Sequence, residues 1–330
     1  MSSPLRFQTL VVHPGGQIVP TEEEVEVVGP YHVLVRIEAA AIHPADLNAI
    51  EGKYPGTPAE PYVGGKEGAG VVESVGPEIT EFRVGDRVLV PARGGTWREA
   101  NVYRPDELTL IPPTVPTEQA ALVRINPSSA LRMLRDYVDL QPGEWLAQNA
   151  ANSAVGQAVI QLARHFGWRT INLVRDLSSV DERLRATGDL FFPDCESIAV
   201  EEVAEAKNLR LALNAVGGES ALRLLNGLGD SGTLVTYGAM ARRPLKVPNG
   251  LLIFRDLSLR GFWLTRWARA QKREVYQAML TELIDLAAAG VLHSAVDTVY
   301  PLSAFADALA HAGRGHRKGK ILFGTVTPKT

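Results

Sequence analysis

Cysteine is almost absent from this chain of 330 residues, since Cys195 is the only one. A single cysteine cannot form an intramolecular disulfide, and it excludes a metal site built from several thiolates. An excess of either charge is missing too, because 34 basic and 37 acidic residues leave a formal net charge of −3. Such a chain has no bulk attraction to nucleic acid or to an anionic membrane. We therefore expect neither as a partner.

Long apolar runs are also missing. No stretch reaches the ~18 apolar residues of a membrane-spanning helix, and the start, MSSPLRFQTL, lacks the apolar segment of a signal peptide. These absences predict a cytoplasmic protein. What is present, 45% hydrophobic and 22% charged residues, is typical of a globular protein, and a chain of 330 residues favours two domains.

The first part of the chain, up to about Leu122, is rich in glycine, proline and short β-like runs. Such runs mix β-branched and apolar residues between turn signals, and they cover residues 5–12, 32–41, 70–75 and 87–90. A helical turn is expected at 44–51, followed by a long loop rich in glycine and proline, and loops of this length are often functional. The pattern predicts an irregular β domain.

From Pro116 onward, strands and helices alternate. Helices are expected at 117–122, 127–137, 155–166, 178–186, 218–228 and 269–289, and strands at 145–149, 170–174, 190–192, 211–215, 233–237 and 257–262. This alternation predicts βαβ units and a parallel, doubly wound sheet. The end of the chain, with strands at 295–300 and 319–323 and a helix at 303–312, does not continue the pattern.

The stretch 144–167, EWLAQNAANSAVGQAVIQLARHFG, reads as a strand, a tight turn and an amphipathic helix. The N-terminus of such a helix is an anion site, because its unpaired N–H groups point beyond the strand. Of the three glycines of a dinucleotide fingerprint only Gly156 is present, with Ser153 and Ala154 nearby and Val155 between them. A packed strand, turn and helix without a ligand is the alternative.

The next strand ends in Arg175 and Asp176, about 20 residues after Gly156, where a dinucleotide fold meets the adenosine ribose. An acidic side chain there accepts from the ribose 2′-OH, whereas an arginine suits a 2′-phosphate. We favour NADP over NAD, and the alternative for Arg175 is a solvated charge at a strand end.

Two later strands end in further candidates for the same crevice, since ligands of open α/β sheets lie beyond the carboxyl ends of the strands. Gly238 would let the backbone approach a flat ring, and Trp263 would form a wall of the crevice. For Trp263 the alternative is an ordinary core or dimer-interface aromatic. The candidate residues are Tyr237, Gly238, Ala239, Met240, Phe262, Trp263 and Leu264.

Five phrases in the same order carry a resemblance over nearly the whole chain: NAANSAVGQAVIQLA, INLVRD, LALNAVGG, TLVTYGAM and IFRDLSLRGFWL. They resemble the 2-enoyl thioester reductase branch of the medium-chain dehydrogenase/reductase superfamily. The resemblance implies an α/β fold with a GroES-like catalytic β domain, residues 1–125 and 297–330, and an inserted Rossmann NADP-binding domain, residues 126–296. It also implies NADPH-dependent reduction of the 2,3 double bond of enoyl-CoA or enoyl-acyl carrier protein.

The resemblance gives roles to individual residues. Tyr54, in the segment IEGKYP, matches the catalytic tyrosine of the family, and a hydroxyl near the enolate formed after hydride transfer suits that role. Whether Tyr54 protonates Cα or orients a water is open. Asn126 matches an asparagine of the cofactor cleft, and Lys320 is the nearest candidate for a cofactor-contacting lysine, with Lys318 competing. Cofactor-contacting segments of the family match Ser153, Ala154, Val155, Gly156, Arg175, Asp176, Leu177, Tyr237, Gly238, Ala239, Met240, Phe262, Trp263 and Leu264.

Zinc-dependent members of the superfamily resemble the chain around AIHPADL and GGKEGAG, where their ligands are a cysteine and, about 20 residues on, a histidine beside a glutamate. Here these places hold His43, Lys66 and Glu67. A lysine brings a positive charge to the zinc position, and no cysteine is near. We expect no zinc, and we expect His43 to be a hydrogen-bonded wall of the cleft.

Two other functions stay open: an NADPH-dependent quinone or activated-alkene reductase, and a non-catalytic NADPH-binding sensor or structural protein. A homodimer is expected, with 257–264 as the candidate edge strand. The basic residues Arg266, Arg269, Lys272 and Arg273 suit the phosphates of coenzyme A or an acidic acyl carrier protein. A solvated helix face is the favoured interpretation of these residues, because Glu274 and Glu282 partly offset the charge.

Overall fold

The computed structural model describes residues 5–25, 28–196, 200–203, 208–315 and 317–324. Internal contacts divide the chain into two compact units: unit 1 is Met1–Ile125 with Gln277–Thr330, and unit 2 is Asn126–Tyr276. In this division the C-terminal part of unit 1 begins at Gln277, inside a helix, and the domain boundary expected at residue 297 stays a prediction. The catalytic and NADP-binding roles of the two parts stay predictions.

Unit 1 is a β domain built from both ends of the chain, as the resemblance implied. Its small sheet has the order β2-β1-β4, and its larger sheet has the order β15-β16-β3-β5-β6-β8, with β7 also paired to β3. The strands are β1 (Leu5–Val12), β2 (Ile18–Val25), β3 (Val33–Ala41), β4 (Tyr62–Val63), β5 (Gly68–Val75), β6 (Arg87–Val90), β7 (Ala100–Tyr103), β8 (Thr109–Leu110), β15 (Val296–Tyr300) and β16 (Lys320–Gly324). The core includes the fully buried Trp97 and Tyr103 and, from the C-terminal strand, Phe323.

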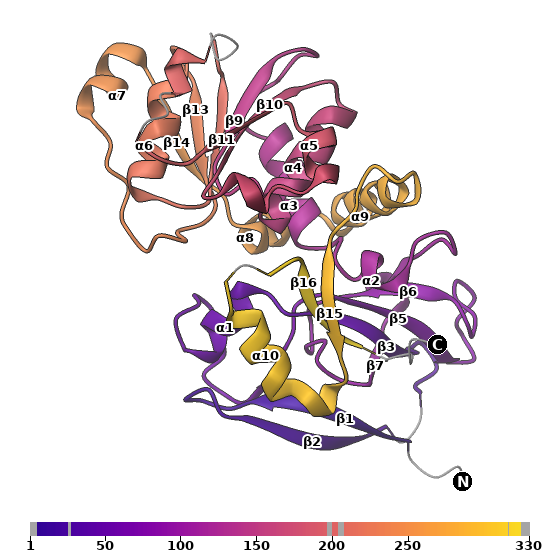
Figure 1. Cartoon of the computed structure of the whole chain (residues 1–330). Helices are drawn as coiled ribbons and strands as arrows, with labels where there is room; N and C mark the ends of the chain where they lie inside the picture. The colour runs from indigo at the N-terminus through magenta and orange to yellow at the C-terminus, as the bar shows by residue number, and fades with distance from the viewer. Residues whose placement is uncertain (1–4, 26–27, 197–199, 204–207, 316, 325–330) are drawn as a thin grey trace. The chain divides into compact units, whose positions relative to one another are not determined.

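Short helices surround these sheets, and Figure 1 shows α1 and α10 beside each other in unit 1. They are α1 (Pro44–Ile50), η1 (Pro105–Glu107), α2 (Thr117–Ala120), η5 (Leu302–Ala304) and α10 (Phe305–Gly313), with most of α9 (Arg273–Ala288). Helix α1 begins as its sequence predicts, with proline at its first position and the Asp46 carboxylate accepting from the His43 backbone N–H at 2.8 Å.

Unit 2 contains one six-stranded sheet with the order β11-β10-β9-β12-β13-β14, and every pairing is parallel. The strands are β9 (Trp145–Gln148), β10 (Arg169–Val174), β11 (Leu190–Pro193), β12 (Leu211–Asn214), β13 (Thr233–Thr236) and β14 (Ser258–Gly261). This is the order 3-2-1-4-5-6 of a Rossmann fold, so the predicted doubly wound sheet is confirmed. The strand order reverses between β9 and β12, which is where such sheets bind ligands.

Helices flank the sheet of unit 2, as Figure 1 shows. They are α3 (Asn126–Arg135), α4 (Ala154–His165), α5 (Glu182–Thr187), α6 (Gly218–Gly227), α7 (Asn249–Arg255) and α8 (Leu264–Ala270), with the short turns η2 (Leu177–Ser179) and η3 (Val200–Glu202). Two predicted helices are wrong as continuous elements. The charged helix at 178–186 is split, because Asp181 caps a new helix by accepting from the Leu184 N–H at 2.7 Å. The long helix at 269–289 is interrupted at Gln271, whose backbone is extended.

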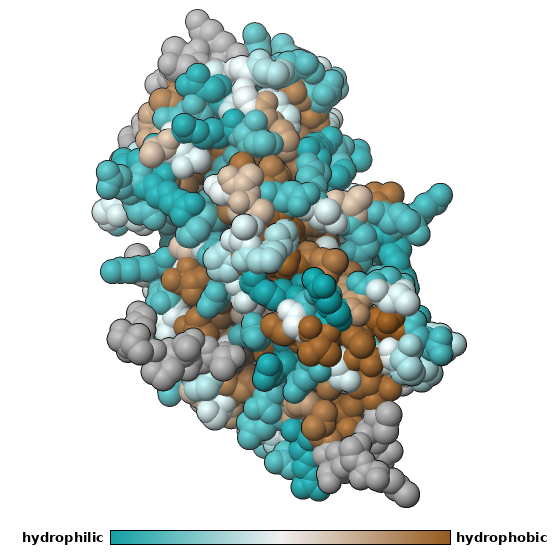
Figure 2. All heavy atoms as spheres, turned by 90° about the vertical axis from the view of Figure 1, so that its right-hand side faces the viewer, coloured by the Kyte–Doolittle hydropathy of each residue, from teal (hydrophilic) through white to brown (hydrophobic). Residues whose placement is uncertain are grey.

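Among the residues that the structure describes, no helix is both long and apolar enough to cross a bilayer. Figure 2 shows brown apolar areas interrupted by hydrophilic residues on one face of the molecule. In unit 2 the large exposed apolar side chains include Leu252, Ile253 and Phe254 of α7, and Phe254 is 83% exposed.

Candidate active site

The turn after β9 departs from the glycine-rich turn of a dinucleotide fingerprint, of whose three glycines only Gly156 is present. Ala150 holds the left-handed conformation, with φ +49°, where glycine is the usual residue. Ser153 caps α4 by accepting from the Gly156 N–H at 3.1 Å. A Cβ on Gly156 would lie 2.6 Å from the Ala151 carbonyl oxygen, so only glycine fits this close approach. Ala154 is simply the first helical residue.

Buried amides hold the carboxyl ends of three strands together. The Asn149 Nδ2 donates to Asn214 Oδ1 and to the Ser220 hydroxyl, both at 2.8 Å, and Gln148 Nε2 donates to Asn172 Oδ1 at 2.9 Å. Sequence reasoning missed these residues. Their signal was the appearance of Asn and Gln at the ends of otherwise apolar strands, where a buried amide requires partners. The network rigidifies the edge at which a ligand would bind.

Beyond β10, the two residues that the sequence predicts to decide between NAD and NADP have different surroundings. Arg175 is exposed at the end of the strand. The Asp176 carboxylate instead caps η2, with Oδ1 accepting from the Ser178 N–H at 2.8 Å and Oδ2 from the Ser178 hydroxyl at 2.6 Å. Both oxygens of Asp176 thus accept hydrogen bonds from Ser178, whereas the Arg175 side chain is exposed. Leu177 packs into a small core cluster.

The segment after β13 folds back over β12. The Tyr237 N–H donates to the Asn214 carbonyl at 3.0 Å, and a Cβ on Gly238 would lie 2.7 Å from the Ala215 carbonyl oxygen. The neighbouring backbone by itself already requires a glycine at position 238, and the contact of Gly238 with a cofactor ring stays a prediction. Burial raises the pKa of Tyr237 well above its usual value, and the Ser153 hydroxyl beside it lowers that pKa in part. Two predicted cofactor segments thus meet at Tyr237 and Ser153.

The remaining candidates of this edge are partly exposed. Ala239 and Met240 lie at the surface, and Phe262 and Leu264 are half-buried. Trp263 is 39% exposed, so it is not a core aromatic. The crevice wall and the dimer interface remain as its possible roles.

Asn126 opens α3 and is 6% exposed. Its side-chain Nδ2 is buried and has no hydrogen-bond partner within the described part of the chain. A buried donor without an acceptor costs about 1–3 kcal/mol, so it is typical of a group that a ligand satisfies. This orphaned donor fits the predicted contact of Asn126 with a cofactor.

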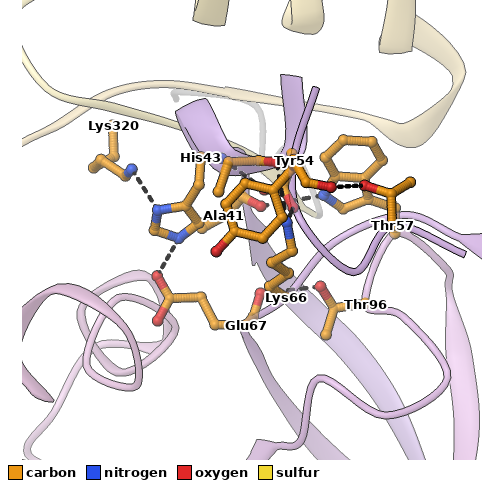
Figure 3. A network of polar contacts seen from close by, with 11 residues as sticks. Ala41, His43, Tyr54, Thr57, Lys66, Glu67, Thr96 and Lys320 are labelled. Carbon is orange, nitrogen blue, oxygen red and sulfur yellow. Dashed lines mark hydrogen bonds and ion pairs between the residues drawn. The ribbon is translucent and has the colours of Figure 1, made fainter. Parts of the chain in front are cut away.

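In unit 1, three buried ionisable side chains form a row, which Figure 3 shows. The Lys320 ammonium donates to His43 Nδ1 at 3.0 Å, so the ring proton lies on Nε2, which donates to Glu67 Oε1 at 2.5 Å. The other Glu67 oxygen accepts from the Ile125 N–H at 2.9 Å. Both nitrogens of His43 are therefore engaged, one with a basic and one with an acidic side chain.

Burial lowers the pKa of Lys320 to about 8, although the carboxylates of Glu67 and Asp46 act in the opposite direction. Arg317 lowers this pKa further. Lys320 is 8% exposed at the start of β16, whereas the competing Lys318 is exposed. Sequence reasoning proposed Lys320 as a cofactor contact and missed its pairing with His43.

Tyr54 lies on the loop after α1, half-buried, with its ring against a cation. The Lys66 ammonium is 4.3 Å from the centre of the Tyr54 ring. The same ammonium is 3.3 Å from Asp46 Oδ1 and donates to the Ala45 carbonyl at 3.1 Å. Figure 3 shows the lysine stem running up to the Tyr54 ring. Asp46, at 4% exposure, was missed, although its place three residues after His43 is a capping signal.

The positions that hold zinc ligands in other members of the superfamily are thus occupied by a hydrogen-bonded histidine and an ion-paired lysine. Across the residues that the structure describes, no group of three or more His, Cys, Asp or Glu side chains could hold a metal ion. The polar contacts of His43, Lys66 and Glu67 are instead made within the protein.

Two family profiles match this chain. Residues 29–109 match the alcohol dehydrogenase GroES-like domain, and residues 191–322 match the zinc-binding dehydrogenase family. The second match does not include His43, Lys66 or Glu67, so its description carries no ligand assignment for them.

Known proteins are similar over most of the chain. The mitochondrial enoyl-[acyl-carrier-protein] reductase of Caenorhabditis elegans is 46% identical over 75% of this chain and 74% of its own length. The human protein of the same name is 39% identical over 93% of this chain and 86% of its own length. A solved complex of Etr1p with NADP and crotonyl-CoA has a TM-score of 0.84 and 25% identity, covering 97% of this chain and all of that one.

These relatives correct one expectation. The predicted cytoplasmic location is contradicted, because the similar curated proteins are named as mitochondrial. The expectation came from the missing apolar segment of a secretory signal, and that absence says nothing about mitochondrial targeting, which uses amphipathic, arginine-rich segments.

Proposed function

We propose that this chain, which belongs to the enoyl thioester reductase branch of the medium-chain dehydrogenase/reductase superfamily, reduces the 2,3 double bond of 2-enoyl thioesters with NADPH. The observation that carries the proposal is Tyr54, whose ring is held by Lys66 at the position that the family resemblance assigns to catalysis. Coenzyme A and acyl carrier protein present the same thioester to the site, so an enoyl-CoA serves as the assay substrate.

NADPH fits the residues of unit 2. The orphaned Asn126 Nδ2 needs an acceptor, and the N-terminus of α4 suits a pyrophosphate. Arg175 is exposed to meet a 2′-phosphate, whereas the Asp176 carboxylate is engaged with Ser178 and is poorly placed to accept from a ribose 2′-OH. These environments favour NADPH over NADH.

Hydride addition to Cβ, which NADPH supplies when bound, leaves negative charge on the thioester oxygen and Cα of the substrate. The Tyr54 hydroxyl stabilises that negative charge, either by donating a hydrogen bond to the enolate or by donating a proton to Cα. One hydride and one proton are added, and the thioester bond stays intact. Other cofactor contacts are assigned to Ser153, Ala154, Val155, Gly156, Leu177, Tyr237, Gly238, Ala239, Met240, Phe262, Trp263, Leu264 and Lys320.

No zinc is assigned to the reaction. His43 is hydrogen-bonded on both ring nitrogens, and Lys66 places an ammonium group where a metal ligand would stand. Displacing the Lys320 and Glu67 contacts of His43 to bind a metal would leave two buried charges unpaired, which is costly.

A homodimer is proposed through the β14 edge of unit 2. Strand β14 ends the described sheet, and α7 nearby in sequence exposes Leu252, Ile253 and Phe254. An unpaired strand edge beside exposed apolar side chains is typical of an interface. Light scattering of the purified protein should give twice the mass of the 35.7 kDa chain, and Phe254→Glu should shift it toward a monomer.

The activity is tested by offering two substrates with NADPH in excess. Crotonyl-CoA should be turned over faster than 1,4-benzoquinone, and the reverse order would refute the thioester assignment in favour of a quinone reductase. An absence of turnover with either substrate, despite NADPH binding, would favour the non-catalytic alternative. Tyr54→Phe should lower kcat by roughly 100-fold or more while NADPH affinity is kept, as expected for loss of a general acid.

A further inference from the structure

Lys66 lies on a backbone segment that is tightly packed on both sides. Two glycines before it pack against Trp97, and a Cβ on Gly64 would lie 2.1 Å from the Trp97 ring. The next residue, Glu67, is fully buried and accepts hydrogen bonds from His43 and from the Ile125 backbone. The backbone that carries Lys66 is therefore held on both sides.

The loop that carries Tyr54 has much looser surroundings. Gly52 and Gly56 have positive φ values, and a Cβ on either would meet nothing within 4 Å. Backbone turns shape the loop, with the Lys53 N–H donating to the Asn48 carbonyl at 2.7 Å and the Thr57 hydroxyl donating to the Tyr54 carbonyl at 2.7 Å. These bonds fix the main chain of Tyr54 and leave its ring direction to side-chain contacts.

The Lys66 ammonium joins the rigid segment to this ring. It sits 4.3 Å from the ring centre, and the buried Asp46 carboxylate, which also accepts from the His43 N–H, holds it in place from α1. An ammonium over an aromatic face is attracted by the ring quadrupole, and the attraction is larger where water is partly excluded. Lys66 is 31% exposed and Asp46 is 4% exposed, so the contact is partly desolvated.

We propose that Lys66, supported by Asp46, is the positioning residue of the active site: it holds the Tyr54 ring so that the hydroxyl meets the substrate enolate. The inference rests on the proposed function of Tyr54. The inference assigns a positioning role to Lys66, which lies where zinc-dependent members of the superfamily carry a metal ligand. In place of a metal, this chain uses the cation to orient its acid.

Four variants test the role. Lys66→Met keeps the apolar stem without the charge, Lys66→Gln keeps a hydrogen-bond donor without the charge, and Lys66→Arg keeps a cation that stacks on an aromatic ring. Lys53→Met is the matched control, because Lys53 lies on the same loop and pairs with the exposed Glu51. Each protein is assayed with crotonyl-CoA and NADPH, and its melting temperature is measured.

We expect both neutral variants to lower kcat roughly 5- to 30-fold, the range that a partly desolvated cation–π contact corresponds to. The KM for crotonyl-CoA and the Kd for NADPH should stay within about twofold of the parent values. Lys66→Arg should recover most of the loss, and Lys53→Met should behave as the parent. An unchanged kcat in a folded neutral variant would overturn the inference, as would an arginine variant no better than methionine.

The Tyr54→Phe background separates this inference from the proposed function. If Lys66 acts through the Tyr54 hydroxyl, Lys66→Met should change kcat by no more than about twofold in that background. A full further loss there would refute the positioning role while leaving Tyr54 catalytic. If Tyr54→Phe alone leaves kcat unchanged, the proposed role of Tyr54 fails, and the inference fails with it.

Discussion

The buried Lys320 should lose its proton at a pH where other lysines keep theirs. Its pKa falls from 10.5 to about 8, mainly because burial disfavours the charged form. Below pH 8 the lysine is charged in both the folded and the unfolded chain, so the folded state bears the full free-energy cost of burying the charged lysine. Between pH 8 and 10.5 the unfolded chain binds the proton that the folded chain has released, so the free energy of unfolding rises with pH.

The size of the change in the free energy of unfolding follows from the two pKa values of Lys320, in the unfolded and in the folded chain. The difference of about 2.5 pH units, at ~1.36 kcal/mol each, is worth about 3 kcal/mol. We therefore expect the stability of unit 1 to rise by about 3 kcal/mol, relative to that of Lys320→Met, as pH increases through this window. Both Glu67 and His43 remain in the variant, so the comparison isolates the lysine.

Two measurements check this prediction. In protein labelled with 13C at lysine Cε, the Lys320 signal, assigned by its loss in Lys320→Met, should titrate near pH 8. Lys318→Met is the control, since its exposed side chain should not alter that signal. Urea unfolding of unit 1 can be followed through the indole N–H of Trp97, which donates to the Ala41 carbonyl at 3.1 Å. A Lys320 signal that titrates with the other lysines near pH 10 would refute the reasoning.

Three further predictions concern the cofactor turn and the metal. Arg175→Ala should weaken NADPH binding roughly 10- to 100-fold in a fluorescence titration, as a lost charge-assisted hydrogen bond implies, but should hardly change NADH binding; equal losses would contradict the 2′-phosphate assignment. Gly156→Ala should destabilise unit 2 by about 1–3 kcal/mol in urea unfolding, because its methyl group would overlap the Ala151 carbonyl, and an unchanged midpoint would count against that packing. Dialysis against EDTA should leave activity intact, whereas a loss that zinc restores would overturn the metal-free proposal.

Much of the fold of unit 2 could be predicted, because short stretches of sequence are enough to indicate its strands and helices. Apolar runs of strand length, separated by helical periodicity, are enough to indicate a parallel sheet. The role proposed for Arg175 also rests on local information, its place after the second strand, and it stays a prediction. Edge strands were harder to predict from the sequence, as β2 of unit 1 shows. This strand carries Pro20 and three glutamates, so it lacks the apolar alternation of a half-buried strand. Such residues are tolerated because β2 lies at the edge of its sheet.

The electrostatics of unit 1 could not be predicted in the same way. Lys320 and His43 are 277 positions apart, and no spacing rule connects residues at that distance. The sequence indicated that the positive charge of Lys66 is unsuited to a zinc site. It could not predict the contact of Lys66 with Tyr54, because that contact depends on the path of the loop, rich in glycine and proline, that follows α1. By contrast, the pairing of Asp46 with the start of α1 was accessible from the pattern His-Pro-Ala-Asp, which is a helix-capping signal.

The position of β16 has a consequence for how the chain folds. This strand pairs with β15 on one side and with β3 on the other, so the large sheet of unit 1 has a gap between them until residues 320–324 arrive. Unit 2 is continuous in sequence and can close its own sheet earlier during synthesis. Unit 1 cannot complete its large sheet until residues 320–324 are synthesised, and β3 has an open edge until then. Nascent chains stalled before Lys320 should therefore carry a finished unit 2 together with an unfinished, aggregation-prone β domain.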